Sequence, residues 1–266
     1  MPDDDRYAMA DNELLLESQR LHHGHAAGDP ATVECLEAIG VARGWRCLDV
    51  GAGAGSITRW LAQRVGPEGH VVALDYNTRF LTGLPDNVTI RQADVRDNAA
   101  FEEHDYFDLA HCRLLLIWMA DPVAVLRRMA ASLRPGGVLL AEEGNFDLQS
   151  VFGYPGAAEL NRIFEARQAA GTFLGPAGYS PYRFRYLADM LADVGLEPLN
   201  VKIKVEAAGP GDPMFEVYRL IYLSQKMSGA GTGMDEKELA AWERFCEHPD
   251  ARIIPGTLIR AWARRP

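Results

Sequence analysis

The chain has 266 residues, which is long enough for one large α/β domain with a substantial core, or for a domain with a small additional lobe. Apolar residues make up 48% and charged residues 24%, as in ordinary globular proteins, so the composition argues against intrinsic disorder. The 27 basic and 37 acidic residues give a net charge of −10, which would repel a phosphate backbone. We therefore expect a small-molecule substrate and no nucleic-acid partner.

The sequence predicts neither a targeting segment nor a membrane segment. Its first residues, Met-Pro-Asp-Asp-Asp-Arg, are acidic where a signal peptide would be basic. The longest apolar run, Leu114–Ala120, is too short to span a membrane. The 4 cysteines show neither paired nor metal-type spacing, which is typical of reduced thiols. We expect a cytoplasmic protein that does not associate with membranes.

In chain order, two helices come first. Apolar residues within Glu13–Leu21 fit one helix, and Pro30 starts a second helical pattern that Gly40 closes. Strands then alternate with helices. The first predicted strand ends at Asp49. Four further strands are predicted at His70–Asp75, Val88–Gln92, Tyr106–Cys112 and Val138–Glu142. Five strands alternating with helices predict a doubly wound, mostly parallel sheet.

The remaining third of the chain is less regular. We predict helices near Leu160–Ala170, Arg183–Val194, Met214–Met227 and Glu236–Cys246, and strands at Leu196–Val205 and Thr257–Ala263.

The most informative segment is residues 45–56, Trp-Arg-Cys-Leu-Asp-Val-Gly-Ala-Gly-Ala-Gly-Ser. An apolar strand containing Asp49 leads into Gly51, Gly53 and Gly55, and a helical pattern follows. Glycine lets the backbone approach a ligand at a helix N-terminus, so this turn suits a nucleotide. The spacing differs from Gly-x-Gly-x-x-Gly, and Asp49 would repel a pyrophosphate but attract an ammonium group. The alternative is a tight turn that binds no ligand.

Other chemistry-bearing residues also follow strands of the predicted sheet. Asp75, Asp94, His111–Arg113 and Glu142–Asn145 each lie just after a strand. Ligands of open α/β sheets bind beyond the carboxyl ends of the strands. We therefore expect these residues to converge with the glycine turn on one crevice.

Four motifs in this order resemble class I S-adenosylmethionine-dependent methyltransferases. They are Leu48–Gly55, Asp75, Ala93-Asp94-Val95 and Arg134-Pro-Gly-Gly137. The resemblance covers residues 35–145 and the last strand, and implies a Rossmann-like sheet of seven strands. It also implies S-adenosylmethionine as cofactor and S-adenosylhomocysteine as product. The segment His111–Asp121 further resembles bacterial small-molecule methyltransferases, many of them from natural-product pathways.

The resemblance implies one set of contacts at the methionine end of the cofactor. The backbone of Gly51, Gly53 and Gly55 would lie against the methionine part, and Asp49 would face its ammonium group. Arg20 would face the cofactor carboxylate, although a surface ion pair is the alternative.

A second set of contacts is implied at the nucleoside end. Asp75 would accept hydrogen bonds from the ribose hydroxyls, and Asp94 would accept one from the adenine amino group. Tyr76 and Val95 would pack on the adenine, and we place Cys112 in the same site. For any single acid after a strand, the alternative is a helix cap or a turn.

The candidates for a general base are His111 and Glu142, because they follow the fourth and fifth strands near the expected methyl group. A base is needed only if the acceptor enters protonated. The ring of His111 could instead point into the sheet. Strand alternation puts only one of Glu142 and Glu143 toward the crevice, so we expect the other to be solvated or paired with Arg113. No cluster typical of a metal-assisted enzyme is apparent, so we predict no metal.

We expect four regions: residues 1–34 as an N-terminal helical lid, 35–145 as the cofactor-binding core, 146–195 as a helical substrate lid, and 196–266 as C-terminal core strands with a helical insert. The insert is rich in aromatic residues that could line an acceptor pocket or pack in an ordinary core: Phe146, Phe152, Tyr154, Phe173, Tyr179, Tyr182 and Phe184.

The expected function is methyl transfer from S-adenosylmethionine to a small organic molecule. Oxygen is slightly favoured as the acceptor atom over nitrogen or carbon, because of the acidic and aromatic surroundings. One alternative keeps the fold and cofactor but catalyses another reaction, such as a cyclisation. The other is a non-catalytic cofactor-binding protein. A homodimer is a possible assembly.

Overall fold

The computed structural model describes residues 14–146, 148–169, 183–228 and 235–266. The chain divides into two compact units. The first, called the core unit here, comprises Gly28–Glu143, Tyr186–Ile203 and Ile259–Pro266. The second unit comprises the described parts of Met1–Ala27, Gly144–Arg185 and Lys204–Leu258.

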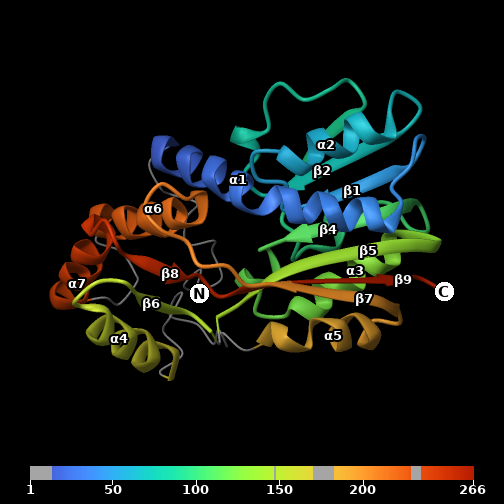
Figure 1. Cartoon of the computed structure of the whole chain (residues 1–266). Coiled ribbons are helices and arrows are strands. Elements are labelled where there is room, and N and C mark those ends of the chain that lie inside the picture. Colours follow the sequence, from blue (N-terminus) through green and yellow to red (C-terminus); the bar gives the residue numbers. More distant parts are fainter. Residues whose placement is uncertain (1–13, 147, 170–182, 229–234) are drawn as a thin grey trace. The chain divides into compact units, whose positions relative to one another are not determined.

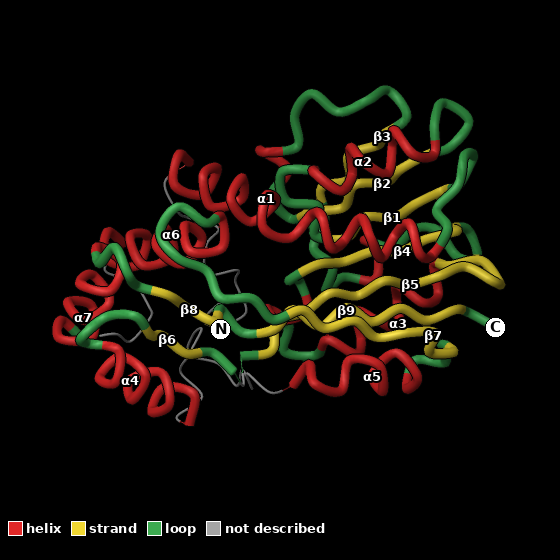
Figure 2. The backbone as a smooth tube through the Cα atoms, viewed as in Figure 1, coloured by secondary structure: helices red, strands yellow, loops and turns green. Residues whose placement is uncertain are grey.

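A seven-stranded sheet with the order β3-β2-β1-β4-β5-β9-β7 forms the centre of the core unit (Figure 2). Its strands are β1 Arg46–Val50, β2 His70–Asp75, β3 Val88–Gln92, β4 Phe107–Arg113, β5 Leu133–Asn145, β7 Glu197–Lys204 and β9 Thr257–Arg264. Strands β1 to β5 pair in parallel. Beside β5, Gly136 donates to the carbonyl of Arg265 and Arg265 donates to that of Gly137, as in antiparallel strands. The doubly wound, mostly parallel sheet expected from the sequence is therefore confirmed.

Helices pack on both sides of this sheet (Figure 1). They are α1 Leu14–Ile39, α2 Ser56–Val65, α3 Pro122–Ser132 and α5 Leu187–Asp193, with 3-10 turns at Thr78–Phe80, Asn98–Ala100, Leu116–Trp118 and Arg183–Tyr186. Leu36 of α1 and Leu61 of α2 pack with Cys47 of β1 and Leu109 of β4 in one fully buried cluster. Burial of such side chains contributes roughly 1.5–3 kcal/mol each.

One continuous helix, α1, replaces the two helices predicted at the start of the chain, and Pro30 lies inside it. Proline removes one backbone hydrogen bond of a helix and crowds the preceding turn. However, Asp29 and Thr32 on either side of Pro30 both bond to Arg113 of β4. Tertiary contacts therefore keep the helix continuous where the local sequence predicts a break.

Strand β5 begins earlier than predicted, because Arg134-Pro-Gly-Gly137 forms a bulge within the strand instead of a turn before it. Phe107 of β4 pairs with Leu133, whereas Leu109 pairs with Val138, so the register shifts between them. A Cβ atom on Gly137 would lie 2.8 Å from the carbonyl oxygen of Phe107. Only glycine fits there, which explains this part of the motif.

The second unit contains α4 Ala157–Ala169, α6 Pro213–Ser228 and α7 Glu236–Glu247, with an antiparallel pair of strands, β6 Ser150–Phe152 and β8 Arg252–Ile254. Its core is aromatic: the rings of Trp242 and Phe245 stack with centroids 5.0 Å apart, and Phe164 and Phe215 pack beside them. The three helices were predicted, but the two short strands were not.

The aromatic residues of the insert have different surroundings. Tyr154 packs against the aromatic core, Phe184 is fully buried and Phe152 is 44% exposed. Phe173, Tyr179 and Tyr182 lie outside the described residues. The lid and the acceptor pocket therefore stay predictions.

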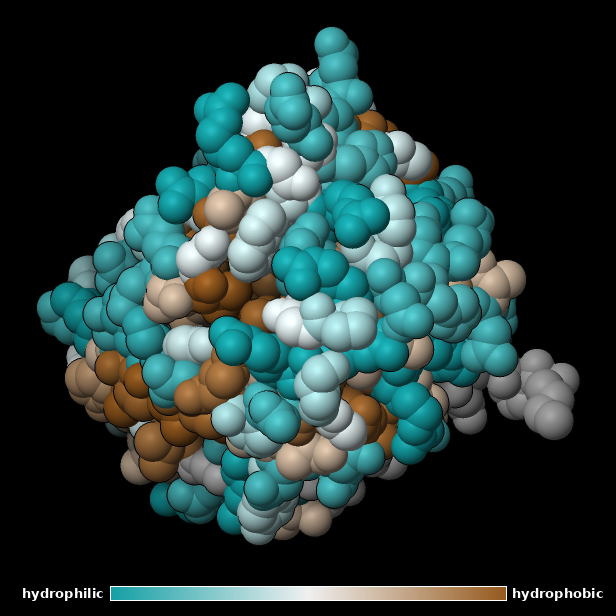
Figure 3. All heavy atoms as spheres, turned by 90° about the vertical axis from the view of Figure 1, so that its right-hand side faces the viewer, coloured by the Kyte–Doolittle hydropathy of each residue, from teal (hydrophilic) through white to brown (hydrophobic). Residues whose placement is uncertain are grey.

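No helix in the described part of the chain is long and apolar enough to cross a membrane. Figure 3 shows a mainly hydrophilic surface that is interrupted by hydrophobic patches.

Candidate functional site

The glycine turn joins the end of β1 to the start of α2. Gly51, Gly53 and Gly55 have φ angles of 73°, 59° and 75°, a region that other residues rarely adopt. The N–H of Gly51 donates to the carbonyl of Leu74 at 2.8 Å, which holds the turn against β2. A Cβ atom on Gly51 would lie 3.1 Å from the side chain of Leu115, so the turn also requires a small residue there.

Asp75 at the end of β2 fixes the turn from the other side. Its Oδ2 accepts the N–H of Gly53 at 2.8 Å, and its Oδ1 accepts the N–H of Asn77 at 2.8 Å. Burial raises the pKa of Asp75 above its ordinary value, although the two backbone bonds oppose this shift. Each carboxylate oxygen can accept a second hydrogen bond, so the group suits hydroxyl donors such as those of a ribose.

Three residues predicted to contact a base lie near the ends of β2 and β3. Tyr76 is 55% exposed, whereas Val95 is buried. The carboxylate of Asp94 is paired with the guanidinium of Arg96 through bonds of 2.6–3.0 Å. These bonds hold the pKa of Asp94 below its ordinary value. An exposed ring, an apolar side chain and a carboxylate acceptor suit a base that carries an amino group.

The most unusual feature is a line of four charged side chains across neighbouring strands, called the charged row here. Oδ1 of Asp49 (β1) lies 2.8 Å from Nδ1 of His111 (β4), and Nε2 of His111 lies 3.1 Å from Oε1 of Glu142 (β5). Nε of Arg260 (β9) lies 2.9 Å from Oε2 of Glu142, which also accepts the hydroxyl of Thr32 (α1) at 3.1 Å. All four charged residues are at most 5% exposed.

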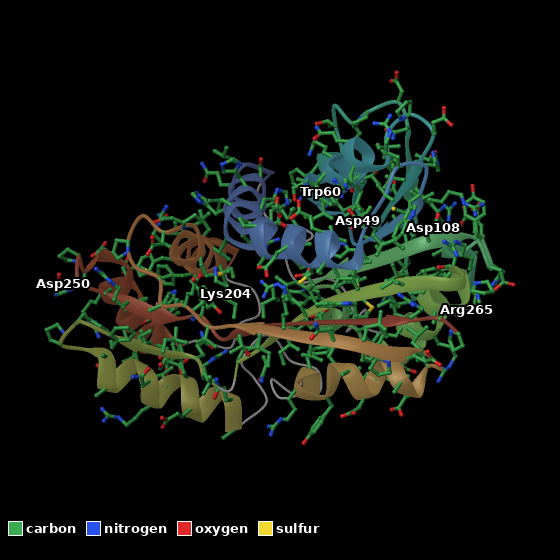
Figure 4. All side chains as sticks on the ribbon, turned by 45° about the vertical axis from the view of Figure 1, so that its right-hand side comes forward. Asp49, Trp60, Asp108, Lys204, Asp250 and Arg265 are labelled. Carbon is green, nitrogen blue, oxygen red and sulfur yellow. The ribbon has the colours of Figure 1, made fainter. Side chains whose placement is uncertain are left out.

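The row runs through the interior of the core unit. Figure 4 shows Asp49 among its packed side chains, whereas Asp108 and Arg265 lie toward the other end of the strands. Buried charges are destabilising unless they are paired, so the row must be almost fully compensated.

The pKa values of His111, Asp49 and Glu142 are shifted from their ordinary values. Burial lowers the pKa of His111, but hydrogen bonds and charges from Asp49 and Glu142 outweigh burial and raise the value to about 9. Burial would raise the pKa values of Asp49 and Glu142, but their bonds to His111 hold both below the ordinary range. The carboxylates are therefore ionised and the imidazole is protonated near neutral pH.

A second group of contacts ties α1 to β4 and α2. Arg113 donates to Thr32 and to Asp29, each at 2.7 Å, and the hydroxyl of Ser56 donates to Asp29 at 3.1 Å. A Cβ atom on Gly28 would lie 3.1 Å from Nη1 of Arg113, so glycine leaves room for the guanidinium. Ser56 is the first residue of α2, so these contacts end at the glycine turn.

Glu143 lies outside the charged row and binds the backbone of the turn after β4. It is fully buried, and its Oε1 accepts the N–H groups of Leu115 and Leu116 at 2.9 Å and 2.6 Å. Leu114, just before them, has a φ of 53°, so the turn after β4 is strained and Glu143 stabilises it. Because Leu115 packs beside Gly51, this carboxylate also supports the glycine turn.

These contacts correct part of the sequence interpretation. Neither Glu142 nor Glu143 is solvated, because both are fully buried, and Arg113 pairs with Asp29 rather than with Glu143. The physical reason is that both carboxylates have partners inside the core unit: Glu142 pairs with His111, and Glu143 accepts two backbone N–H groups.

The predicted contacts with the cofactor all stay predictions. Cys112 is fully buried in β4. Arg20 lies on the part of α1 that belongs to the second unit and bonds to Glu17 at 2.7–2.8 Å. Among the described residues, no group of three or more histidine, cysteine or acidic side chains could hold a metal ion.

Sequence reasoning missed Asp29, Thr32 and Arg260. Arg260 had a usable signal, because it interrupts the apolar run Leu-Ile-Arg-Ala-Trp-Ala of the last strand. A charge in a buried strand predicts a buried partner. Asp29 and Thr32 had no such signal, because Pro30 between them favoured a loop.

Comparisons with known proteins identify the family to which the chain belongs. The methyltransferase-domain family matches residues 48–141. A ubiquinone/menaquinone biosynthesis C-methyltransferase UbiE from Azotobacter vinelandii is 30% identical over 189 residues, which cover 66% of this chain and 69% of that protein. The protein of the same name from Idiomarina loihiensis is 32% identical over 143 residues, which cover 50% of this chain and 52% of that protein. The chain thus spans about half the length of several curated relatives that it matches.

A solved structure of a methyltransferase candidate from Bacillus halodurans C-125 has a TM-score of 0.58 at 18% identity, covering 89% of this chain and 99% of that chain. An identity this low shows the fold alone. Combined with the closer relatives, the strand order and the glycine turn, it leads to one conclusion: the chain belongs to the class I S-adenosylmethionine-dependent methyltransferases.

Proposed function

We propose that this protein transfers the methyl group of S-adenosylmethionine to a carbon atom of a small organic acceptor. Family membership supports the methyl donor. The choice of carbon rests on the curated relatives, which are named C-methyltransferases. Oxygen methylation, which the sequence slightly favoured, finds no support among them, and neither does a cyclisation or a non-catalytic role.

The described residues fit the donor through the chemistry of their side chains. Asp75 offers acceptors for ribose hydroxyls, Asp94 offers one for the adenine amino group, and Tyr76 offers an exposed ring. The positive φ angles of the glycine turn bring backbone close to the methionine part. When bound, S-adenosylmethionine supplies an electrophilic methyl group on a sulfonium sulfur. The protein must orient the acceptor carbon in line with that bond and exclude water.

A carbon acceptor must be electron-rich, for example a ring carbon beside an ionised hydroxyl. The sequence offered His111 and Glu142 as bases that could remove the proton. Both ring nitrogens of His111 face carboxylates, however, and Glu142 is fully buried. This supports an acceptor that ionises without help from these two residues. We therefore propose an acidic phenol or enol, with quinone-type biosynthetic precursors as first candidates because the relatives act in that biosynthesis. We also propose that the inserts form a lid over the substrate and that the protein is cytoplasmic.

The test uses purified protein, S-adenosylmethionine labelled in its methyl group, and a panel of phenol and enol acceptors. We expect S-adenosylhomocysteine to form only with an acceptor, and NMR of the product to show a methyl group on carbon. The Asp75→Ala variant is the control and should form neither. A methyl group on oxygen or nitrogen would overturn the carbon assignment. Cofactor binding without turnover of any acceptor would favour the non-catalytic alternative.

A further inference from the structure

His111 is the centre of the charged row, and hydrogen-bond counting fixes its charge. Its two ring nitrogens each face a carboxylate oxygen, of Asp49 at 2.8 Å and of Glu142 at 3.1 Å. A neutral imidazole carries one N–H and could serve only one of these acceptors. The imidazolium carries two and serves both. A neutral ring would leave one buried, ionised carboxylate oxygen without its donor, which is unfavourable.

The charged groups packed around His111 balance only when it is protonated. The acids are Asp49 on β1, Glu142 on β5 and Asp29 on α1, and the cations besides His111 are Arg113 on β4 and Arg260 on β9. Three negative charges then meet three positive charges. The nearby thiol of Cys35 on α1 adds no charge, since burial raises its pKa to about 11.

The row is also connected to the glycine turn. Oδ2 of Asp49 accepts the hydroxyl of Thr58 at 2.6 Å. Asp49 lies before the three glycines and Thr58 lies in the first turn of α2, so this bond closes the cofactor turn across its base. His111 holds the other oxygen of Asp49, so the direction of the Asp49 carboxylate depends on the His111 proton.

We propose that His111 is a positioning residue that, as an imidazolium, locks Asp49 onto Thr58 and so holds the glycine turn in the shape that binds the cofactor. His111 then acts through Asp49 and touches neither the methyl group nor the acceptor. The proposal rests on the cofactor role of the turn and not on the identity of the acceptor.

One consequence is a dependence of cofactor binding on alkaline pH. The pKa of His111 is raised to about 9. The bond from the imidazolium to Asp49 is therefore intact near neutral pH and is lost as the pH rises through that value. Deprotonation removes the His111 donor from one of the two carboxylates; where that carboxylate is Asp49, its orientation toward Thr58 is no longer fixed.

The first experiment needs no cofactor. NMR of the unliganded protein with nitrogen-labelled histidines should show both nitrogens of His111 protonated at neutral pH, with the neutral form appearing only near pH 9. The signal of His70, whose ring contacts the Thr89 hydroxyl, is the internal reference. A neutral His111 at about pH 7 would overturn the proposal, because the lock requires both protons.

The second experiment measures binding of S-adenosylhomocysteine by calorimetry from neutral to alkaline pH. For His111→Gln we expect an affinity about tenfold weaker than wild type at neutral pH, with the difference disappearing near about pH 10. The amino group of the ligand titrates equally in both proteins, so the ratio of affinities isolates His111. His70→Gln is the matched control and should follow wild type. A ratio that stays constant with pH would mean that His111 only fills space.

A pair of variants at Thr58 keeps the proposal testable if His111→Gln does not fold. Thr58→Val preserves shape but removes the hydroxyl, and we expect about five- to tenfold weaker binding of S-adenosylhomocysteine. Thr58→Ser restores the hydroxyl and should restore most of the affinity. Equal affinities for the two variants would overturn the link between the row and the turn, whatever the enzyme methylates.

Discussion

Two aspartates that the sequence predicts to contact the same cofactor have opposite surroundings. Asp49 is 2% exposed and bonds to His111 and Thr58, which lie on β4 and α2. The side chain of Asp94 is 21% exposed and bonds to Arg96, two residues away. The partners of Asp49 meet only in the folded sheet, whereas Asp94 could meet Arg96 in an unfolded chain. A carboxylate at a strand end can therefore support the fold or remain available to a ligand, and its partners decide which.

The largest expected effect is on stability at the buried aspartate. Asp49→Ala leaves a buried imidazolium without one of its two partners, and we expect a loss of about 3–5 kcal/mol in the free energy of unfolding. Urea denaturation without cofactor measures it. Asp94→Ala is the matched variant at the exposed site. Similar losses at the two positions would refute the contrast drawn above.

The next effect is the pH dependence of stability. The pKa of His111 is raised to about 9, so its contribution is complete below about pH 6.5, the unfolded value, and is lost as the pH rises through 9. The pKa values of Asp49 and Glu142 are lowered, so their contribution is present above about pH 4 and is lost in acid.

We therefore expect the free energy of unfolding to decrease by on the order of 3 kcal/mol between about pH 6.5 and pH 9. Urea denaturation across this range measures it, and His111→Gln should remove most of the slope. An alkaline slope that persists in this variant would assign the loss to other groups.

The third effect is on cofactor affinity. Asp75→Ala removes the proposed ribose acceptor, and we expect S-adenosylhomocysteine to bind about 100-fold more weakly, since each hydrogen bond to a charged group contributes about 1.5–3 kcal/mol. Calorimetry measures the affinity, and circular dichroism checks that the fold is retained. Asp86→Ala changes an exposed loop acid and serves as the control. Unchanged affinity of Asp75→Ala would contradict the ribose contact.

The smallest expected effect comes from changing Asp94, the more exposed of the two aspartates. Asp94→Asn keeps an acceptor oxygen but loses the pairing with Arg96, and we expect the free energy of unfolding to change by less than about 1 kcal/mol. Binding of S-adenosylhomocysteine should weaken by about tenfold or less. A stability loss as large as that of Asp49→Ala would show that the Asp94 pair is structural.

The sequence identified the parts of the site that local patterns encode. Gly51, Gly53 and Gly55 adopt a backbone shape that mainly glycine allows, so their positions alone predicted the turn. Asp75 was placed correctly at the end of β2, because parallel strands present their carboxyl ends at one edge. The number of strands was implied by the family resemblance, and the structure supplies their order.

The charged row could not be predicted in the same way. Asp49, His111, Glu142 and Arg260 are far apart in the chain and become neighbours only through the order β1-β4-β5-β9. Pro30 misled the helix prediction because the contacts that keep α1 intact come from Arg113. The strands β6 and β8 have 3 residues each, too few for an alternating pattern.

The bulge at Arg134–Gly137 has a consequence for which acid enters the row. Phe107 pairs with Leu133 and Leu109 pairs with Val138. Between these two pairs β4 advances by two residues and β5 by five, so the bulge adds an odd number of residues to β5. Side chains alternate between the faces of a strand, and an odd shift exchanges them. Two adjacent glutamates face opposite sides of the strand in any case, but the insertion several residues upstream decides which of them faces His111. Deleting one residue there would move Glu143 into the place of Glu142 beside His111 and Gly144 into the place of Glu143, so the turn after β4 would lose its acceptor.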